Sequence, residues 1–185
     1  MEIFEKVSSE ALVGFAGVLF GSLLTTLGVW LTNRSNAKQS FQRMQHEERV
    51  ASDKVRKERL EELYVLVCHW STLFFSHYAN LRLVMKGTID YNNYLDIINK
   101  DSKGGYEFGR IEMIIRVYGD DKILSYYKAV EVARKEVNLV NSEHKKAYMR
   151  GDSGQPFLEH ADHAQFALGD KLDELKLSIA EAART

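Results

Sequence analysis

Apolar residues form one long unbroken run near the start of the chain. Residues 11–31 (ALVGFAGVLFGSLLTTLGVWL) carry no charge, and serine and threonine are their most polar members. About 20 apolar residues suffice for a helix to cross the ~30 Å hydrocarbon layer of a bilayer. The preceding segment, MEIFEKVSSE, is acidic, whereas a signal peptide begins with a basic region. The pattern therefore predicts a retained transmembrane helix over residues 11–32, after a short N-terminus of residues 1–10.

The apolar run is followed by a charged segment that contains no helix breaker. No glycine or proline occurs between Val29 and Lys86, so the helix is expected to continue as a stalk over residues 33–59. Apolar residues recur in this stalk at alternating four- and three-residue steps, with Glu48 interrupting the series: Ala37, Phe41, Met44, Ala51 and Val55. This spacing is typical of a short coiled coil between parallel helices.

Residues 60–185 have the periodicity of a helical bundle. The first helix of the bundle is expected to end at Gly87 and to bury one side. Its predicted inward residues are Leu60, Leu63, Tyr64, Val67, Trp70, Leu73 or Phe74, His77 and Leu81. The sequence then predicts a short helix capped by Asp90, a second over residues 108–118 and a third from Gly119-Asp120 to about Arg150.

The last predicted helix covers residues 157–183, and two glycine-containing loops, at residues 101–105 and 151–156, separate the helices. Its inward side chains are expected to be Phe166, Leu168, Leu172, Leu175 and Ile179. Nowhere do apolar and polar residues alternate as they do in a strand. The predicted fold class is all-α: one transmembrane helix, a long stalk helix and a helical bundle.

Small residues gather on one side of the predicted transmembrane helix. At 100° per residue they fall within an arc of about 80°. They are Gly14, Gly17, Gly21, Thr25, Gly28 and Thr32, which we call the small-residue face. Small side chains let helix backbones approach closely in lipid. The face therefore predicts assembly with helices of other copies, and its spacing leaves open whether it packs helices together or lines a pore.

Charge sets the expected orientation. Arg34, Lys38 and Arg43 follow the span before any acid, whereas acidic residues dominate ahead of it. Cationic flanks stay in the cytoplasm, so the bundle is expected to be cytoplasmic and the N-terminus outside the inner (plasma) membrane.

The net charge of −1 gives no general attraction to nucleic acid, and no sequence-specific nucleic-acid binding is expected. The single cysteine, Cys68, is interpreted as a small core residue.

The candidate catalytic and metal-binding residues form no complete set. His160 and His163 lie one turn apart beside Glu159 and Asp162, but a stable metal site needs further ligands from elsewhere. His69 and His77 are interpreted as core histidines. We expect no enzyme activity, no catalytic residue, no metal and no cofactor.

Helical ribonucleases hold an arginine four to six residues before a histidine on one helix, where the two groups stabilise phosphate charge and transfer protons. Here the intervals from Arg134 to His144 and from Arg150 to His160 are both too long.

The whole plan resembles small single-span bacterial membrane accessory proteins of antiphage systems, some with a degenerate HEPN-like helical domain. One protein of this kind is the CRISPR-associated member that accompanies an RNA-guided RNA nuclease. RVYGDDKI (residues 116–123) through Tyr127, and YMRGD (residues 148–152), are similar to helical domains of uncharacterised bacterial proteins. The catalytic arginine–histidine pair of HEPN ribonucleases is not matched, and no site residue is carried over. The resemblance implies an oligomer that perturbs the inner membrane during infection.

Two functions remain open from the sequence. The first is a homo-oligomer that makes a pore-like assembly in the lipid bilayer and alters its permeability, as an antiviral defence effector or accessory. The second is a membrane-anchored module that tethers a cytosolic partner, such as a defence protein. Exchanging the span for an unrelated one distinguishes them, because only the first function depends on the small-residue face.

Overall fold

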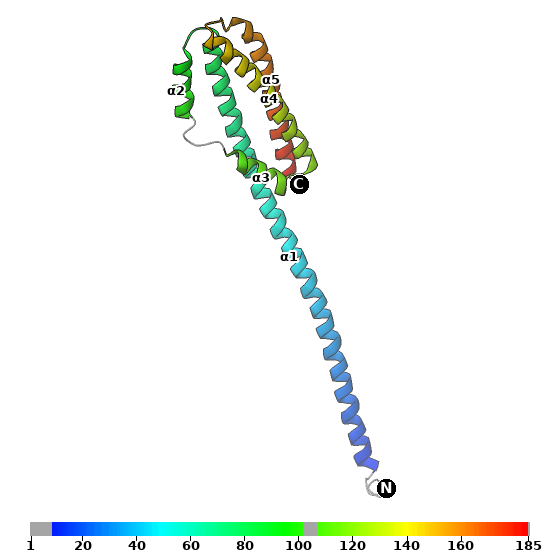
Figure 1. The fold of residues 1–185 in the computed structure, drawn as a ribbon. Coiled ribbons are helices and arrows are strands. Elements are labelled where there is room, and N and C mark those ends of the chain that lie inside the picture. The colour runs from blue at the N-terminus through cyan, green and yellow to red at the C-terminus, as the bar shows by residue number, and fades with distance from the viewer. Residues whose placement is uncertain (1–8, 102–106, 185) are drawn as a thin grey trace. The chain divides into compact units, whose positions relative to one another are not determined.

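The computed structural model describes residues 9–101 and 107–184, and the regular elements within these ranges are helices. In chain order they are α1 (Ser9–Met85), α2 (Tyr91–Asp101), α3 (Phe108–Tyr118), α4 (Asp121–Met149), the short 3₁₀ helix η2 (Gln155–Phe157) and α5 (Leu158–Ala182) (Figure 1). The all-α class is therefore confirmed. The chain divides into two compact units, Met1–Asp53 and Lys54–Thr185.

Helix α1 has 77 residues because no helix breaker interrupts it after Val29. It ends where the sequence predicts, at Gly87, whose φ of 71° favours glycine. The N–H of Gly87 donates to Val84 O (2.9 Å), and that of Thr88 donates to Leu83 O (2.9 Å). These bonds satisfy carbonyl groups that the end of a helix leaves without a partner.

Aspartate side chains begin two of the later helices as predicted. Asp90 accepts a hydrogen bond from the backbone N–H of Asn93 (2.8 Å), and Asp120 accepts one from Ile123 (2.8 Å). Gly119 separates α3 from α4, and a Cβ atom there would lie 2.5 Å from the carbonyl oxygen of Ile115. A larger residue at position 119 therefore cannot make this close turn without moving the backbone.

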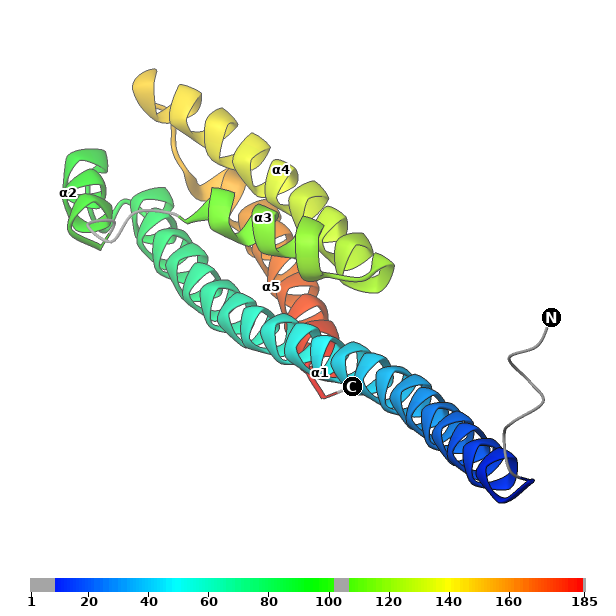
Figure 2. The ribbon, with the colours of Figure 1, turned by 90° about the horizontal axis from the view of Figure 1, so that it is seen from below.

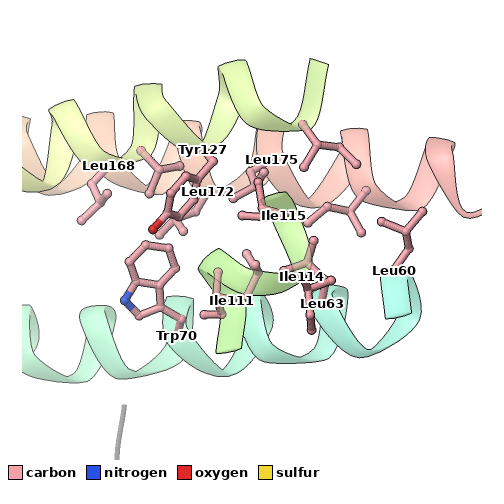
Figure 3. Packing of buried hydrophobic residues seen from close by; sticks show 14 residues of the cluster. Leu60, Leu63, Trp70, Ile111, Ile114, Ile115, Tyr127, Leu168, Leu172 and Leu175 are labelled. Carbon is pink, nitrogen blue, oxygen red and sulfur yellow. The ribbon is translucent and has the colours of Figure 1, made fainter. Parts of the chain in front are cut away.

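The main core of the second unit lies between four helices. Leu60, Leu63 and Trp70 of α1 point toward the isoleucines of α3 and the leucines of α5 (Figure 3). Helix α4 adds Ile123, Tyr127 and Val130, which are also buried. Each helix contributes residues three or four apart, so each presents one apolar side to the cluster. The remaining members are Val67, Ile111, Ile114, Ile115, Leu168, Leu172, Leu175 and Ile179.

A second, smaller core lies at the other end of this unit, where α1 ends. Its buried members are Leu81, Val84, Met85, Tyr94, Val140, Ala161 and Ala164. Helices α4 and α5 run alongside one another (Figures 1 and 2), and small alanines on α5 face this cluster. Tyr94 is the contribution of α2, so this cluster fixes α2 to the unit.

Two of the predicted inward residues are not in the core. Phe166 is 69% exposed, because it lies two residues before Leu168 and so about 200° away around the helix. Gln165 takes the buried place next to it. Tyr64 is 40% exposed, since it follows the fully buried Leu63 and turns toward the edge of the apolar side. The prediction was wrong at both positions.

Three further sequence interpretations need correction or lie outside the described residues. His69 is exposed and His77 is half-buried, so neither is a fully buried core histidine. Cys68 is half-buried rather than buried. Of the predicted loop at 101–105, Asp101 ends α2, and residues 102–105 lie outside the described residues.

Candidate functional site

The apolar part of α1 exposes its large side chains. From Leu12 to Leu31, the leucine, valine, phenylalanine and tryptophan side chains are 47% to 73% exposed. Within the described part of the chain, α1 is the one helix long and apolar enough to cross a membrane. Residues 11–32 span about 33 Å at 1.5 Å per residue, which matches a bilayer's hydrocarbon layer.

The small-residue face is open along its length. A Cβ atom built on Gly14, Gly17, Gly21 or Gly28 would meet no heavy atom within 4 Å outside its own helix backbone. The two threonines of the face turn their hydroxyls back to the helix. Thr25 Oγ1 donates to the carbonyl of Gly21 (2.8 Å), and Thr32 Oγ1 donates to that of Gly28 (2.8 Å). The face therefore presents methyl groups and bare backbone, the surface that close helix packing requires.

The other hydroxyls of the segment are also satisfied within the helix. Ser22 Oγ donates to Leu19 O (2.9 Å), and Thr26 Oγ1 donates to Ser22 O (2.8 Å). Such bonds to a preceding turn remove the need for water. Each side-chain hydroxyl of the described apolar segment is thus paired, as hydrocarbon surroundings would require of a helix.

The three predicted juxtamembrane cations differ in their contacts. The guanidinium of Arg34 lies 5.4 Å from the ring centre of Trp30, within the range of a cation–π contact. Arg43 Nε donates to Glu47 Oε1 (2.8 Å), an exposed i,i+4 pair. Lys38 is exposed. Arg34 therefore lies beside Trp30, the aromatic residue next to the end of the apolar run.

A further apolar stripe on α1 was missed by the sequence analysis. In the second unit, residues on the side of α1 opposite the core recur at three- and four-residue steps: Val65, Cys68, Thr72, Phe75, Ala79 and Leu83. We call them the outer α1 stripe. Val65 is 66% exposed and Phe75 is 64% exposed. The signal was present in the sequence, as a second heptad-like series interleaved with the core series.

An ionic cluster joins α1 to α3 in the second unit. Glu62 receives two bonds from Arg110, Nε to Oε1 (2.6 Å) and Nη2 to Oε2 (2.9 Å), and one from Arg59 Nη1 (2.7 Å). Hydrogen bonds from Arg110 and then Arg59 lower the pKa of Glu62 to about 2. The carboxylate is therefore stabilised in its charged form by two helices.

Removing this carboxylate is expected to change stability in a pH-dependent way. Because the folded-state pKa of Glu62 lies below its ordinary value, the stabilisation is present above about pH 4.5 and is lost as pH falls toward 2. Glu62→Gln should therefore lower the free energy of unfolding at neutral pH, and its deficit relative to the wild type should shrink in acid. Urea unfolding followed by tryptophan fluorescence measures this, with the exposed neighbour Glu61→Gln as the control. A deficit independent of pH would contradict it.

Asp162, which the sequence places beside His160 and His163, is hydrogen-bonded to residues of α1. Its carboxylate accepts hydrogen bonds from Tyr78 Oη (2.6 Å) and from Arg82 Nε (2.9 Å) and Nη2 (3.0 Å). Arg82 first, and then Tyr78, lowers the pKa of Asp162, whereas burial and this bond raise the pKa of Tyr78 to about 12. His160 Nε2 lies 3.1 Å from Glu136 Oε1. Among the described residues, no group of three or more metal-ligating side chains comes together.

The fully buried histidine of the second unit is His144. Its ring packs against Phe157 (5.6 Å between ring centres) and Tyr148 (6.3 Å), and neither ring nitrogen has a hydrogen-bond partner. Gly154 covers it, since a Cβ there would lie 3.0 Å from His144 Nε2 and 2.6 Å from the backbone of Met85. Burial lowers the pKa of His144, so the folded protein holds the neutral ring.

Protonation of His144 is expected to destabilise the second unit. The folded-state pKa lies below the ordinary 6.5, so the unfolded chain binds the proton more readily and stability falls as pH drops below that value. His144→Leu should flatten the decline in unfolding free energy between about pH 7 and pH 5. The exposed His163→Leu serves as the control and should keep the wild-type slope. Equal slopes for all three proteins would refute the assignment.

The fold and the site together define an all-α chain with one long apolar N-terminal helix and a compact helical unit. Comparison of the chain with protein-family models, with curated protein sequences and with solved structures found no match.

Proposed function

We propose that this chain is a homo-oligomeric inner-membrane protein whose single helices assemble through the small-residue face and alter membrane permeability. The observation that carries the proposal is the open face itself, on which glycine positions have no neighbour within 4 Å. An exposed apolar helix of this length is stable in lipid rather than in water. Because one candidate span lies in the described chain, the helix that packs on its face would come from another copy.

The outer α1 stripe supports self-association through the second unit as well. Spans that pack in one membrane with one orientation are parallel, so neighbouring copies present the same helix to one another. Val65 and Phe75 expose most of their surface and follow a heptad-like series, which suits packing between equivalent helices.

The proposed orientation places the N-terminus outside and the helical unit in the cytoplasm. It is supported by Arg34, Lys38 and Arg43, which flank the apolar run on that side. The contact between Arg34 and Trp30 fits a cation and an aromatic ring that share the headgroup region. A role as an antiviral effector or accessory follows from the resemblance to antiphage membrane proteins. A cytosolic defence protein is then the expected trigger.

Exchange of the span tests this function against the alternative of a membrane-anchored tether. The apolar segment is replaced with a polyleucine span of equal length, and the full chain is reconstituted into liposomes loaded with a self-quenched dye. The wild type is expected to release dye and the exchanged protein to lose at least about tenfold in release rate, because leucine blocks close helix approach. Undiminished release by the exchanged protein would contradict a role for the face. Absence of release from both proteins would favour the tether.

A further inference from the structure

One side of α4 carries a regular row of exposed residues. They recur at alternating four- and three-residue steps, which keeps them along one side of a helix. The row consists of Lys128, Val132, Lys135, Leu139, Ser142 and Lys146, and we call it the basic α4 stripe. Val132 and Leu139 are 66% and 51% exposed. The stripe therefore combines three cations with two apolar side chains and contains no acid.

Helix α5 carries a row of the same kind with the opposite charge. It consists of Glu159, His163, Phe166, Asp170 and Asp173, all exposed, and we call it the acidic α5 stripe. Phe166, which the core does not bury, lies at its centre. The stripe contains three acids and neither lysine nor arginine. Both stripes lie wholly within the unit formed by residues 54–185.

Most charged members of the two stripes are unpaired within the described part of the chain. Five of them belong to no ion pair among the described residues: Lys128, Lys135, Lys146, Glu159 and Asp170. Asp173 pairs with Lys176 (2.6 Å) on its own helix. The stripes therefore present free charges of opposite sign, which makes each of them electrostatically complementary to the other.

Two contacts show that the stripes occupy the same part of the unit. Lys122 Nζ of α4 donates to Glu181 Oε2 of α5 (2.7 Å), and Glu136 Oε1 lies 3.1 Å from His160 Nε2. Residue numbers thus rise along α4 as they fall along α5, so the two helices are antiparallel (Figure 1). In copies that share one membrane and one orientation, α4 of one copy is likewise antiparallel to α5 of its neighbour. The stripes of neighbouring copies can therefore meet at nearly equal height.

An antiparallel alignment matches the stripes residue by residue. The steps between members are equal when α4 is followed forward and α5 backward, so a single match sets all the others. The resulting pairs are Val132 with Asp173, Lys135 with Asp170, Leu139 with Phe166, Ser142 with His163, and Lys146 with Glu159. An apolar pair thus lies between two pairs of opposite charge, an apolar centre with a charged rim. Packing α4 against α4 would instead place lysines together, and like charges repel.

We propose that the basic α4 stripe of one copy binds the acidic α5 stripe of the next copy. Because two different surfaces meet, each copy in a pair keeps one unused stripe, and the contact repeats from copy to copy until a ring closes. A two-fold dimer would join like stripes, whose charges disfavour it. The contact rests on the proposed homo-oligomer, and it names the surfaces of the second unit that order the copies around the ring.

Charge reversal tests the contact in the full-length protein. Lys135→Glu with Lys146→Glu makes the α4 stripe acidic, and Glu159→Lys with Asp170→Lys makes the α5 stripe basic. Each reversed protein is expected to have a dissociation constant at least about tenfold higher, as measured by sedimentation in mild detergent, because like charges then face each other. All four changes in one chain restore opposite charges and should return the dissociation constant to within about threefold of the wild type.

Mixing the two reversed proteins tests whether the contact joins unlike surfaces. Each reversed protein alone carries two stripes of one sign, whereas an equal mixture offers opposite signs at every contact between the two proteins. The mixture is therefore expected to form assemblies in which the two proteins alternate. Native mass spectrometry should find equal numbers of each protein per assembly. A mixture that stays as dispersed as its components would overturn the proposal.

Lys57→Glu with Lys100→Glu is the matched control, since it makes the same change of net charge as the α4 reversal at exposed positions outside both stripes. The control should assemble like the wild type, and circular dichroism melting checks that every variant is folded. If folded reversed proteins assemble as well as the wild type, or if the control is weakened as much as they are, the contact is wrong while assembly through the small-residue face stands. Assembly that follows charge in this way but releases no dye from liposomes would support the contact and contradict the proposed function. A monomeric wild type would contradict both.

Discussion

Replacing both Gly17 and Gly21 with leucine is expected to convert the assembled protein to its monomer. Each new side chain would stand between neighbouring backbones, where small residues allow close approach. The change does not disturb the isolated helix, because no atom outside it lies within 4 Å of either added Cβ. Leucine also has a higher helix propensity than glycine. We expect the dissociation constant to rise by at least about tenfold, as measured by analytical ultracentrifugation in mild detergent.

A matched variant on the other side of the helix separates packing from hydrophobicity. Ala16→Leu adds the same kind of side chain about 140° away from the centre of the small-residue face. It should leave the mass of the assembly unchanged. If the Gly17 and Gly21 changes also left the mass unchanged, this face would not be the contact, and the outer α1 stripe would be the next surface to change.

Truncating Leu172 is expected to cause a large loss of stability in the second unit. Leu172 is 1% exposed in the core formed by α1, α3, α4 and α5 (Figure 3). Leu172→Ala should lower the free energy of unfolding by about 2–5 kcal/mol, since it removes buried apolar surface and leaves a cavity. Urea unfolding followed by tryptophan fluorescence measures it, with Trp70 in the same core as one of the two reporting residues.

The control for this change lies on the same helix. Leu177 is 62% exposed, so Leu177→Ala removes the same atoms from a site with little packing and should change stability by only about 0.5 kcal/mol. Similar losses for the two variants would mean that α5 does not bury the side that contains Leu172.

Sequence patterns predicted helix positions better than they predicted which side chains are buried. The breaks at Gly87, Gly119 and Gly151 and the caps at Asp90 and Asp120 depend on local backbone chemistry, so they could be read from neighbouring residues. Burial depends on which helices meet. Phe166 is apolar but turns outward, whereas the polar Gln165 is buried.

The histidines illustrate the same limit. His69 and His77 lie in an apolar sequence, yet the fully buried ring is His144, which stands between charged neighbours in a polar stretch. Its burial results from α1, α4 and the segment around Gly154 coming together, a contact between residues distant in the chain. The ion pairs of Glu62 with Arg110 and of Asp162 with Arg82 were missed for the same reason. The outer α1 stripe could have been predicted from the sequence, because its spacing is regular.

The mass of the full-length protein in nanodiscs tests the central claim most directly. Native mass spectrometry or light scattering on the wild type gives the number of chains per assembly. The proposed function predicts a ring of several copies, with enough helices to surround a permeation path. A monomer or dimer would contradict it, because so few helices cannot enclose a channel, and the chain would then be a membrane-anchored tether for a cytosolic partner.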